Sequence, residues 1–412
     1  MLQIPELLAP AGDLERLRYA VCYGADAVYC GMPEFGMRSA PANFTPEQLE
    51  EGVIFAHARG RKVYLTLNTL PTNEEADRLP EAIRQAAKAG VDAFIVADLG
   101  VLDACKTYAP EIDVHMSTQT GITNYAAANA CYKMGAKRVV LARELPLEEI
   151  KRIRDKTPPE LEIETFVHGA MCMSFSGRCL LSNYMIGRDA NRGECAQPCR
   201  WGYYLMEEKR PGQYFPIYED EKGSYILNAK DLCMIEYIDK VIEAGVTSLK
   251  IEGRAKSFYY VAVVTNAYRQ AVDLYKKDPA HFQLPAWIEE ETRKVSHRQY
   301  STGFYFGRPE QGQYYENGGY VRQWDVVAVV DKTENDILYC TQRNKFSLGE
   351  TVEILCPGGT PEQQPISYTV TAITDAEGNA RQTANNAMMK LTMPAKGLRL
   401  PAGAIIRRAA EA

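Results

Sequence analysis

The amino-acid sequence predicts an α/β protein: a (β/α)8 TIM-like barrel that carries a Cys-rich insertion and is followed by a small all-β domain. Three observations lead to this prediction. Residues 1–275 repeatedly alternate a short apolar run with an amphipathic segment, and eight strand–helix units make a closed barrel. Residues 171–224 break the alternation and concentrate cysteines. After residue 320, short alternating runs such as VVAVV and TVEIL are separated by turn signals such as PGG.

Each candidate strand of the barrel is a short apolar run that ends in polar residues or glycine. The segments between them place apolar residues at i, i+3 and i+4, which is typical of helices that cover a sheet. An open, doubly wound sheet is the alternative for such a pattern. The segment Tyr225–Leu232 reads as a ninth strand or an ordered loop. The eight candidates are Pro5–Pro10, Ala25–Cys30, Lys62–Asn68, Asp92–Asp98, Asp113–Gln119, Arg138–Arg143, Leu161–Gly169 and Ser248–Arg254.

The sequence divides into three parts. Residues 1–275 form the predicted barrel, with the insertion at 171–224 after the seventh strand. Residues 276–320 read as a linker of helical and loop character, rich in aromatic residues and glycine toward its end. Residues 321–412 are predicted to form a small β-barrel domain. An insertion as long as 171–224 without regular structure is usually functional.

Composition and charge narrow the class of protein. The chain has 412 residues and a formal net charge of −6, which argues against a uniformly basic nucleic-acid binder but allows a local basic patch. No apolar run approaches the length of a membrane-spanning helix, and the start of the chain lacks the pattern of a secretory signal. We therefore expect a cytoplasmic protein without membrane contact. In that reducing compartment its eleven cysteines should be thiols or metal ligands.

Four cysteines in the insertion form the strongest candidate site: Cys172, Cys179, Cys195 and Cys199, spaced C-x6-C-x15-C-x3-C. Thiolates that converge from a loop rich in arginine and glycine suit a metal centre, because soft ligands gather while the backbone bends freely. The spacing lacks the paired C-x2-C of common zinc ribbons, which favours an iron–sulfur cluster over structural zinc. Buried inert thiols are the third interpretation. Cys233 is a candidate fifth participant.

A second set of candidates comes from the predicted strand ends, because the active face of such barrels lies at the C-terminal ends of the strands. Polar residues there are often only helix caps. The run KIEGRAKS, residues 250–257, is more specific, since it brings acidic and basic side chains to a strand end just before a helix N-terminus. A Cys–His nucleophilic pair of Cys172 and His168 is less favoured than a ligand role for Cys172. The catalytic candidates are Glu164, His168, Arg143, Lys250, Glu252 and Arg254.

At these residues the chain resembles the U32 peptidase family, also called collagenase-like proteases. The resemblance is carried by ETFVHGAMCMSFSGRCLLSNY (164–184), and by PELLAPAG, GADAVYCG, RGECAQPCRW, YILNAKDLC and SLKIEGRAKSFYY. The run RPGQYFPIYEDEKGSYI (210–226) and the β-rich tail are similar to the branch of the family that forms 5-hydroxyuridine at the tRNA wobble position with prephenate as oxygen source.

The resemblance implies that Cys172, Cys179, Cys195 and Cys199 hold an iron–sulfur cluster of the 4Fe-4S type. In some relatives the position of Cys233 supplies a ligand instead. It further implies tRNA and a small carboxylate, prephenate, as partners in the reaction. Arg143, Arg254 and Lys250 would then contact a carboxylate or a phosphate. The competing hypotheses are a peptidase, for which no hydrolytic residue set stands out in the sequence, and a non-catalytic scaffold with structural zinc.

Overall fold

The protein is described here by a computed structural model that covers residues 4–36, 43–171, 179, 181–188, 194–198, 218–220, 223–225, 230–307, 321–359 and 364–410. Packing divides the chain into two compact units. The first comprises residues 1–21, 25–256 and 297–320, and the second comprises residues 22–24, 257–296 and 321–412. No helix within the described residues is long and apolar enough to cross a membrane.

The first unit is a closed barrel of eight parallel strands. Neighbouring strands pair in chain order, and the pairing of β7 with β11 closes the ring, which excludes the open doubly wound sheet. All eight candidate strands are confirmed. They are β1 (Glu6–Pro10), β2 (Ala27–Gly31), β3 (Lys62–Leu67), β4 (Ala93–Val96), β5 (Asp113–Met116), β6 (Arg138–Val140), β7 (Glu162–Ala170) and β11 (Ser248–Ile251).

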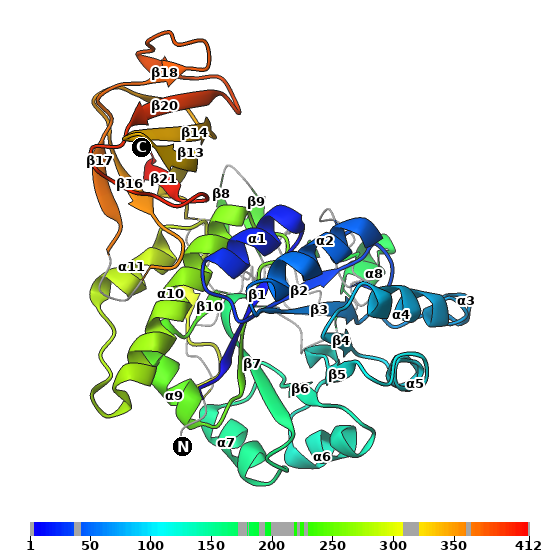
Figure 1. Ribbon diagram of the computed structural model, residues 1–412. Helices are drawn as coiled ribbons and strands as arrows, with labels where there is room; N and C mark the ends of the chain where they lie inside the picture. Colours follow the sequence, from blue (N-terminus) through cyan, green and yellow to red (C-terminus); the bar gives the residue numbers. More distant parts are fainter. Residues whose placement is uncertain are drawn as a thin grey trace, which may run out of the picture. The chain divides into compact units, whose positions relative to one another are not determined.

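Helices connect these strands on the outside of the ring (Figure 1). Polar residues at the strand ends begin several of them: the side chain of Asp98 accepts hydrogen bonds from the amides of Gly100 and Val101, and so caps the helix after β4. The helices are α1 (Leu14–Cys22), α2 (Pro46–His57), α3 (Asn73–Ala76), α4 (Leu79–Lys88), α5 (Leu99–Tyr108), η1 (Thr118–Thr120), α6 (Tyr125–Lys133), α7 (Leu147–Asp155), α8 (Leu181–Ile186), η4 (Ile235–Tyr237) and α9 (Ile238–Glu243).

The insertion leaves and rejoins the barrel at one point. β7 runs beyond its short neighbour β6, and on that free edge it pairs antiparallel with β10 (Asp231–Cys233). Asp231 lies opposite Ala170, so the two ends of the insertion are neighbours in the sheet. The short strand β12 (Tyr300–Ser301) pairs with β10 in turn. Within the insertion, β8 (Tyr218–Asp220) and β9 (Gly223–Tyr225) form a separate antiparallel pair.

A buried ion pair fixes this junction. The carboxylate of Asp231 accepts hydrogen bonds from the Arg298 amide at 3.0 Å and from its Nε at 2.9 Å, and both side chains are almost fully buried. The Arg298 guanidinium holds the pKa of Asp231 below its usual value, although burial alone would raise it. Of the predicted strand or ordered loop 225–232, residues 226–229 lie outside the described residues, Tyr225 ends β9, and Asp231 and Leu232 belong to β10, which is antiparallel to β7.

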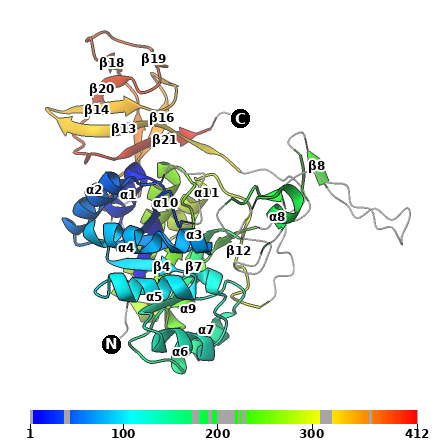
Figure 2. The same ribbon diagram turned by 90° about the vertical axis from the view of Figure 1, so that its right-hand side faces the viewer.

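The second unit contains an antiparallel seven-stranded sheet in the order β17-β16-β21-β13-β14-β20-β18. Its core is aliphatic, with Val330, Leu338, Ile354 and Ile406 fully buried. Figure 2 shows strands of this sheet, among them β13, β14 and β20, lying side by side. The strands are β13 (Trp324–Glu334), β14 (Ile337–Gln342), β16 (Thr351–Leu355), β17 (Ile366–Thr369), β18 (Thr374–Asp375), β20 (Lys390–Pro394) and β21 (Ile405–Ala409), with β15 (Phe346–Ser347) and β19 (Thr383–Ala384) as a separate pair.

Three helical segments belong to this second unit by packing: α10 (Phe258–Lys277), η5 (Pro279–His281) and α11 (Ala286–Arg293). A fully buried arginine on β21, Arg407, joins two of them to the sheet. It donates to Glu291 of α11 at 2.6 Å, to Glu353 of β16 at 2.9 Å and to the Tyr259 hydroxyl of α10 at 3.5 Å. The barrel predicted from the sequence ends at residue 275, a boundary that would assign α10 to the barrel instead. Sequence periodicity identifies a helix but not the partner against which it packs.

Candidate active site at the C-terminal end of the barrel

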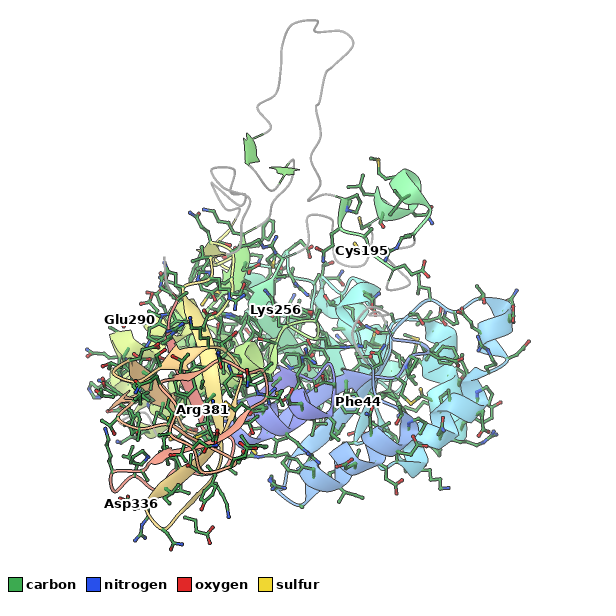
Figure 3. All side chains as sticks on the ribbon, turned by 90° about the horizontal axis from the view of Figure 1, so that it is seen from above. Phe44, Cys195, Lys256, Glu290, Asp336 and Arg381 are labelled. Carbon is green, nitrogen blue, oxygen red and sulfur yellow. The ribbon has the colours of Figure 1, made fainter. Side chains whose placement is uncertain are left out.

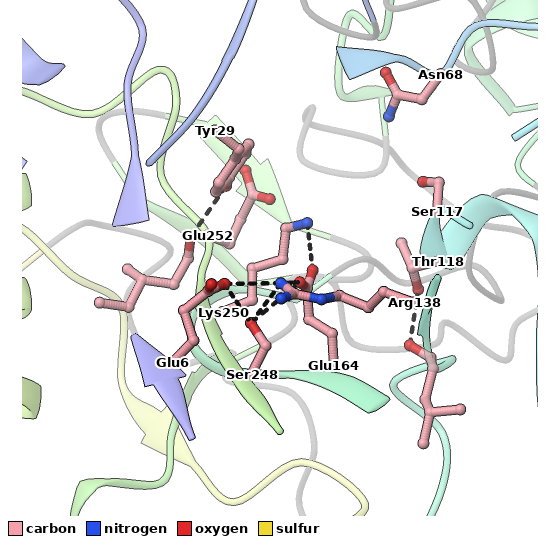
Figure 4. Close-up of polar contacts among 12 residues, drawn as sticks. Glu6, Tyr29, Asn68, Ser117, Thr118, Arg138, Glu164, Ser248, Lys250 and Glu252 are labelled. Atoms are coloured by element: carbon pink, nitrogen blue, oxygen red, sulfur yellow. Dashed lines mark hydrogen bonds and ion pairs between the residues drawn. The ribbon is translucent and has the colours of Figure 1, made fainter. Parts of the chain in front are cut away.

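The barrel interior contains a network of charged side chains where apolar residues are usual. Glu164 on β7 is fully buried and accepts hydrogen bonds from Lys250 Nζ on β11 at 2.7 Å and from Arg138 Nη1 on β6 at 2.9 Å. Arg138 also donates to Glu6 at 2.8 Å and to the Ser248 hydroxyl at 3.1 Å. Figure 4 shows both cations meeting at Glu164. The register places Arg138 opposite Glu162 and Lys250 opposite Phe166. The network therefore lies along the N-terminal half of β7, inside the barrel.

Glu164 stays ionised inside the protein because two cations surround it. Burial would raise the pKa of its carboxyl, but Lys250 and Arg138 outweigh burial and lower the pKa below its ordinary value. Glu164 in turn holds Lys250 in a charged, fixed position. The Lys250 ammonium also lies 4.6 Å from the ring centroid of Tyr29, whose hydroxyl donates to the Ile251 carbonyl at 3.0 Å. The strand β11 therefore presents Lys250 to the barrel interior in one defined orientation.

The lowered pKa of Glu164 leads to a prediction about pH. A carboxyl with a depressed folded-state pKa contributes its stability above its unfolded pKa and loses it as pH falls through the folded value. We expect Glu164→Gln to be less stable than the parent protein, with the largest difference above about pH 4.5. The difference should narrow at lower pH, because a protonated Glu164 is as neutral as glutamine. Urea unfolding between pH 3 and pH 7 measures both proteins, and a difference that does not change with pH contradicts the assignment.

At the C-terminal end of the barrel, Arg143 connects β6 to the start of the insertion. Its Nη1 donates to the Ala170 carbonyl at 2.7 Å, and its guanidinium lies 3.7 Å from the ring centroid of Phe166. Glu252, just after β11, is 3.8 Å from Arg143 Nη2. Both side chains keep a small exposed area, 14% and 16%. Gly169 permits this approach, because a Cβ there would lie 2.4 Å from the Glu252 carbonyl oxygen and its φ is +111°.

Arg254 lies at another part of the same end of the barrel. It is buried and donates to Thr66 Oγ1 on β3 at 2.9 Å and to Asn43 Oδ1 at 2.8 Å. Its guanidinium rests against the backbone of Gly31 at the end of β2, where a Cβ would lie 2.5 Å from Nη2. Glu252 and Arg254 are therefore held by different partners, although they are two residues apart.

His168 faces the junction between the barrel and the insertion. Its Nε2 is 3.4 Å from the Tyr300 hydroxyl, and the Tyr300 ring stacks on His297 at 4.3 Å. Burial is the main cause that lowers the pKa of His168 to about 3. His168 is therefore a neutral imidazole at neutral pH and lies beside Cys233, its partner in the β7–β10 register.

Two of the four cysteines of the predicted metal centre lie within the described residues. Cys179 is half-buried and Cys195 is exposed. Cys195 lies in the short segment 194–198 beside α8, where the Ala196 amide donates to the Ser182 hydroxyl at 3.1 Å (Figure 3). Cys172 and Cys199 lie outside the described residues. A set of four thiolates in one insertion is the donor chemistry that iron–sulfur clusters and zinc require, so the residues fit the proposed group.

Cysteines elsewhere in the chain have a different character. Burial raises the pKa of Cys30, Cys105 and Cys340 to about 12 in each case. They are therefore protonated thiols in apolar surroundings, which are poor metal ligands.

The structure joins four of the six catalytic candidates into two pairs, Glu164 with Lys250 and Arg143 with Glu252. Arg254 and His168 each contact other residues. Three of these side chains carry a positive charge and two a negative charge, with His168 neutral. That balance suits a bound anion. Sequence reasoning missed Arg138, Phe166 and Tyr29, which position Glu164, Arg143 and Lys250. Glu162, Glu164 and Phe166 alternate along β7, so the sequence already indicated that these three side chains share one face of the strand.

Comparison with known proteins adds the family. The model of "Peptidase family U32" matches residues 12–314, and that of its C-terminal domain matches residues 322–407. The chain is 41% identical to "tRNA hydroxylation protein P1" of Bacillus subtilis, over 93% of this chain and 90% of the relative. It is 37% identical to "tRNA hydroxylation protein P" of Escherichia coli, over 91% and 90%. It is 40% identical to "23S rRNA 5-hydroxycytidine C2501 synthase" of Escherichia coli, over 65% of this chain and 39% of the relative.

Proposed function

The chain belongs to peptidase family U32, and from this premise we propose that it is a cytoplasmic tRNA hydroxylase that converts the wobble uridine to 5-hydroxyuridine. Two relatives named for tRNA hydroxylation, from Bacillus subtilis and Escherichia coli, match the chain over nine-tenths of its length. The relative named as a 5-hydroxycytidine synthase modifies another pyrimidine. The family name suggests peptide hydrolysis, but the residues of the site favour binding of an anion.

The observation that carries the proposal is the junction of the insertion with the barrel. Arg143 holds the Ala170 carbonyl where the insertion begins, and Asp231 is held by Arg298 where it ends. The cysteine-bearing segment is thereby attached beside the cationic end of the barrel. A substrate held by Arg143 would lie next to the insertion.

The barrel residues supply binding and orientation in this proposal. Prephenate, the proposed oxygen source, has carboxylates that Arg143, Arg254 and Lys250 can bind through charge-assisted hydrogen bonds. Glu252, beside Arg143, limits the rotation of that guanidinium and can accept a proton at its carboxylate. His168 is neutral, so it can donate or accept a hydrogen bond without adding charge.

Cys172, Cys179, Cys195 and Cys199 would hold the iron–sulfur cluster in this proposal, with Cys233 as the alternative fourth ligand. When bound, such a cluster supplies one-electron transfer or activates a bound oxygen-containing group. Apolar residues beside the junction exclude water and orient the substrate. Val167 and Leu232, which flank the junction, are almost fully buried.

The decisive experiment is to express the chain in Escherichia coli that lacks its own tRNA hydroxylation protein P and to analyse tRNA nucleosides by mass spectrometry. We expect 5-hydroxyuridine or its derivatives to appear. The same strain blocked in prephenate synthesis should lose them, and added prephenate should restore them. No hydroxylated uridine in the complemented strain would refute the function. Degradation of gelatin by the purified protein, lost in Cys172→Ala, would instead support a peptidase.

Arg143 provides a sharper prediction for this assay. We expect Arg143→Ala to lower hydroxylated uridine about tenfold or more, because a charge-assisted hydrogen bond contributes about 1.5–3 kcal/mol. Arg152→Ala is the matched control, since Arg152 on α7 is 58% exposed and pairs only with Glu149, at 3.5 Å, within the described residues. Equal hydroxylation by the two variants would remove Arg143 from the site.

A further inference from the structure

His115 on β5 is a buried histidine for which the proposed reaction gives no role. It is 2% exposed, and its ring meets the Tyr64 ring edge-on at 4.8 Å inside the barrel. Its Nδ1 is fully buried and has no hydrogen-bond partner among the described residues. A buried polar atom without a partner costs about 1–3 kcal/mol, so such atoms are rare in folded proteins. The described residues therefore leave this nitrogen open to a partner from outside them, such as a bound small molecule.

Lys250 has hydrogen-bonding capacity left in the same interior. Its ammonium has three N–H donors. Within the described part of the chain it donates one hydrogen bond, to Glu164, and otherwise faces the rings of Tyr29 and Phe166 at 4.6 and 5.5 Å. The side chain is 6% exposed, so bulk water has little access to the remaining donors.

The strongest charges that act on His115 are positive, and they include Lys250 and Arg138, both of which pair with Glu164. The charged groups that act on it most strongly are all cations: Arg138, Lys250, Lys62 and Lys137. With burial, they hold the pKa of His115 well below its ordinary value, so the imidazole is neutral. A neutral imidazole has one N–H donor and one acceptor nitrogen, and can bond either a carboxylate oxygen or a hydroxyl group.

We propose that His115 and Lys250 form a binding site inside the barrel for one small carboxylic acid. The carboxylate receives the free donors of Lys250, and His115 bonds a second polar atom of the same molecule. The Tyr64 ring packs edge-on against the imidazole, and Glu164 holds the Lys250 ammonium by a hydrogen bond. The acid that we name is prephenate, and this choice rests on the proposed function.

The test measures binding and stability on the same full-length proteins. Titration calorimetry with prephenate as the probe should show an affinity that His115→Leu weakens about tenfold or more, corresponding to one lost hydrogen bond. Without the acid, His115→Leu should melt at or above the temperature of the parent protein, because leucine removes an unpartnered buried polar atom. His57→Gln is the control, since the His57 side chain is 42% exposed on α2. It should change neither measurement.

Three outcomes would overturn the inference. The first is no binding of prephenate by the parent protein, and the second is equal binding by His115→Leu. The third is a lower melting temperature of His115→Leu without the acid, which would show that His115 only packs the core. The proposed function is judged separately. If the acid binds through His115 but the complemented strain makes no hydroxylated uridine, the site stands and the reaction assignment fails.

Discussion

Replacing Cys179 by alanine is expected to remove the proposed metal centre completely and, with it, tRNA hydroxylation. A four-thiolate site that loses one ligand opens to solvent and no longer retains its metal. The same result is expected for Cys172→Ala, Cys195→Ala and Cys199→Ala. Iron and sulfide analysis after anaerobic purification measures the loss, together with the absorbance band near ~400 nm that is typical of such clusters.

Cys131→Ala is the matched control for the cysteine series. Cys131 lies on α6, is 5% exposed, and has its pKa raised by burial. Its removal should leave iron and sulfide unchanged. If one of the four variants keeps the metal content of the parent protein, that residue is not a ligand, and Cys233 becomes the fourth ligand to test. Zinc without sulfide in the parent protein would replace the cluster by a structural metal.

Replacing Arg138 by methionine should destabilise the protein by about 3–5 kcal/mol, because the fully buried Glu164 carboxylate loses one of its two cations. Arg138 is 3% exposed and bridges Glu6, Glu162 and Glu164 on β1 and β7. These two strands lie on either side of β11, which closes the barrel by pairing with both. A domain has a free energy of unfolding of about 5–15 kcal/mol in total, so the variant should be only marginally stable.

Chemical unfolding in urea measures this loss, with Arg152→Met as the control. An exposed ion pair such as Arg152–Glu149 contributes about 0–1 kcal/mol, so the control should unfold close to the parent protein. If Arg138→Met also loses less than about 1 kcal/mol, the network does not stabilise the barrel. Arg138 would then serve only to orient Glu164 and Lys250.

The sequence allowed the barrel strands to be predicted because parallel strands buried on both faces are continuous apolar runs. β2, with the sequence AVYCG, is buried at every position. The direction of β10 was not predictable, because a three-residue strand carries no pattern that distinguishes parallel from antiparallel pairing. The grouping of α10 with the C-terminal sheet involves contacts such as that between Arg407 and Tyr259, which are 148 residues apart.

The candidate site was predictable only in part, for a related reason. The strand-end rule identified Arg143, Glu252 and Arg254, because position in the barrel follows from position in the strand. It did not find Arg138, which opens its strand and reads as a surface residue. It did not find His115 either, since a single histidine in the short run DVHM has no sequence pattern that marks it as lacking a partner.

The adjacency of Ala170 and Asp231 in the sheet has an evolutionary consequence. Two strands that already lie side by side can be joined by any length of chain without disturbing the ring of eight strands, as a tight turn joins a hairpin. The entropic cost of closing a loop rises only with the logarithm of its length, by about 0.6 kcal/mol for each doubling. Relatives are thus free to lengthen, shorten or exchange this segment while keeping the same barrel. Chimeras that swap residues 171–230 between members of the family should fold, and they would reveal which part of the protein chooses the RNA.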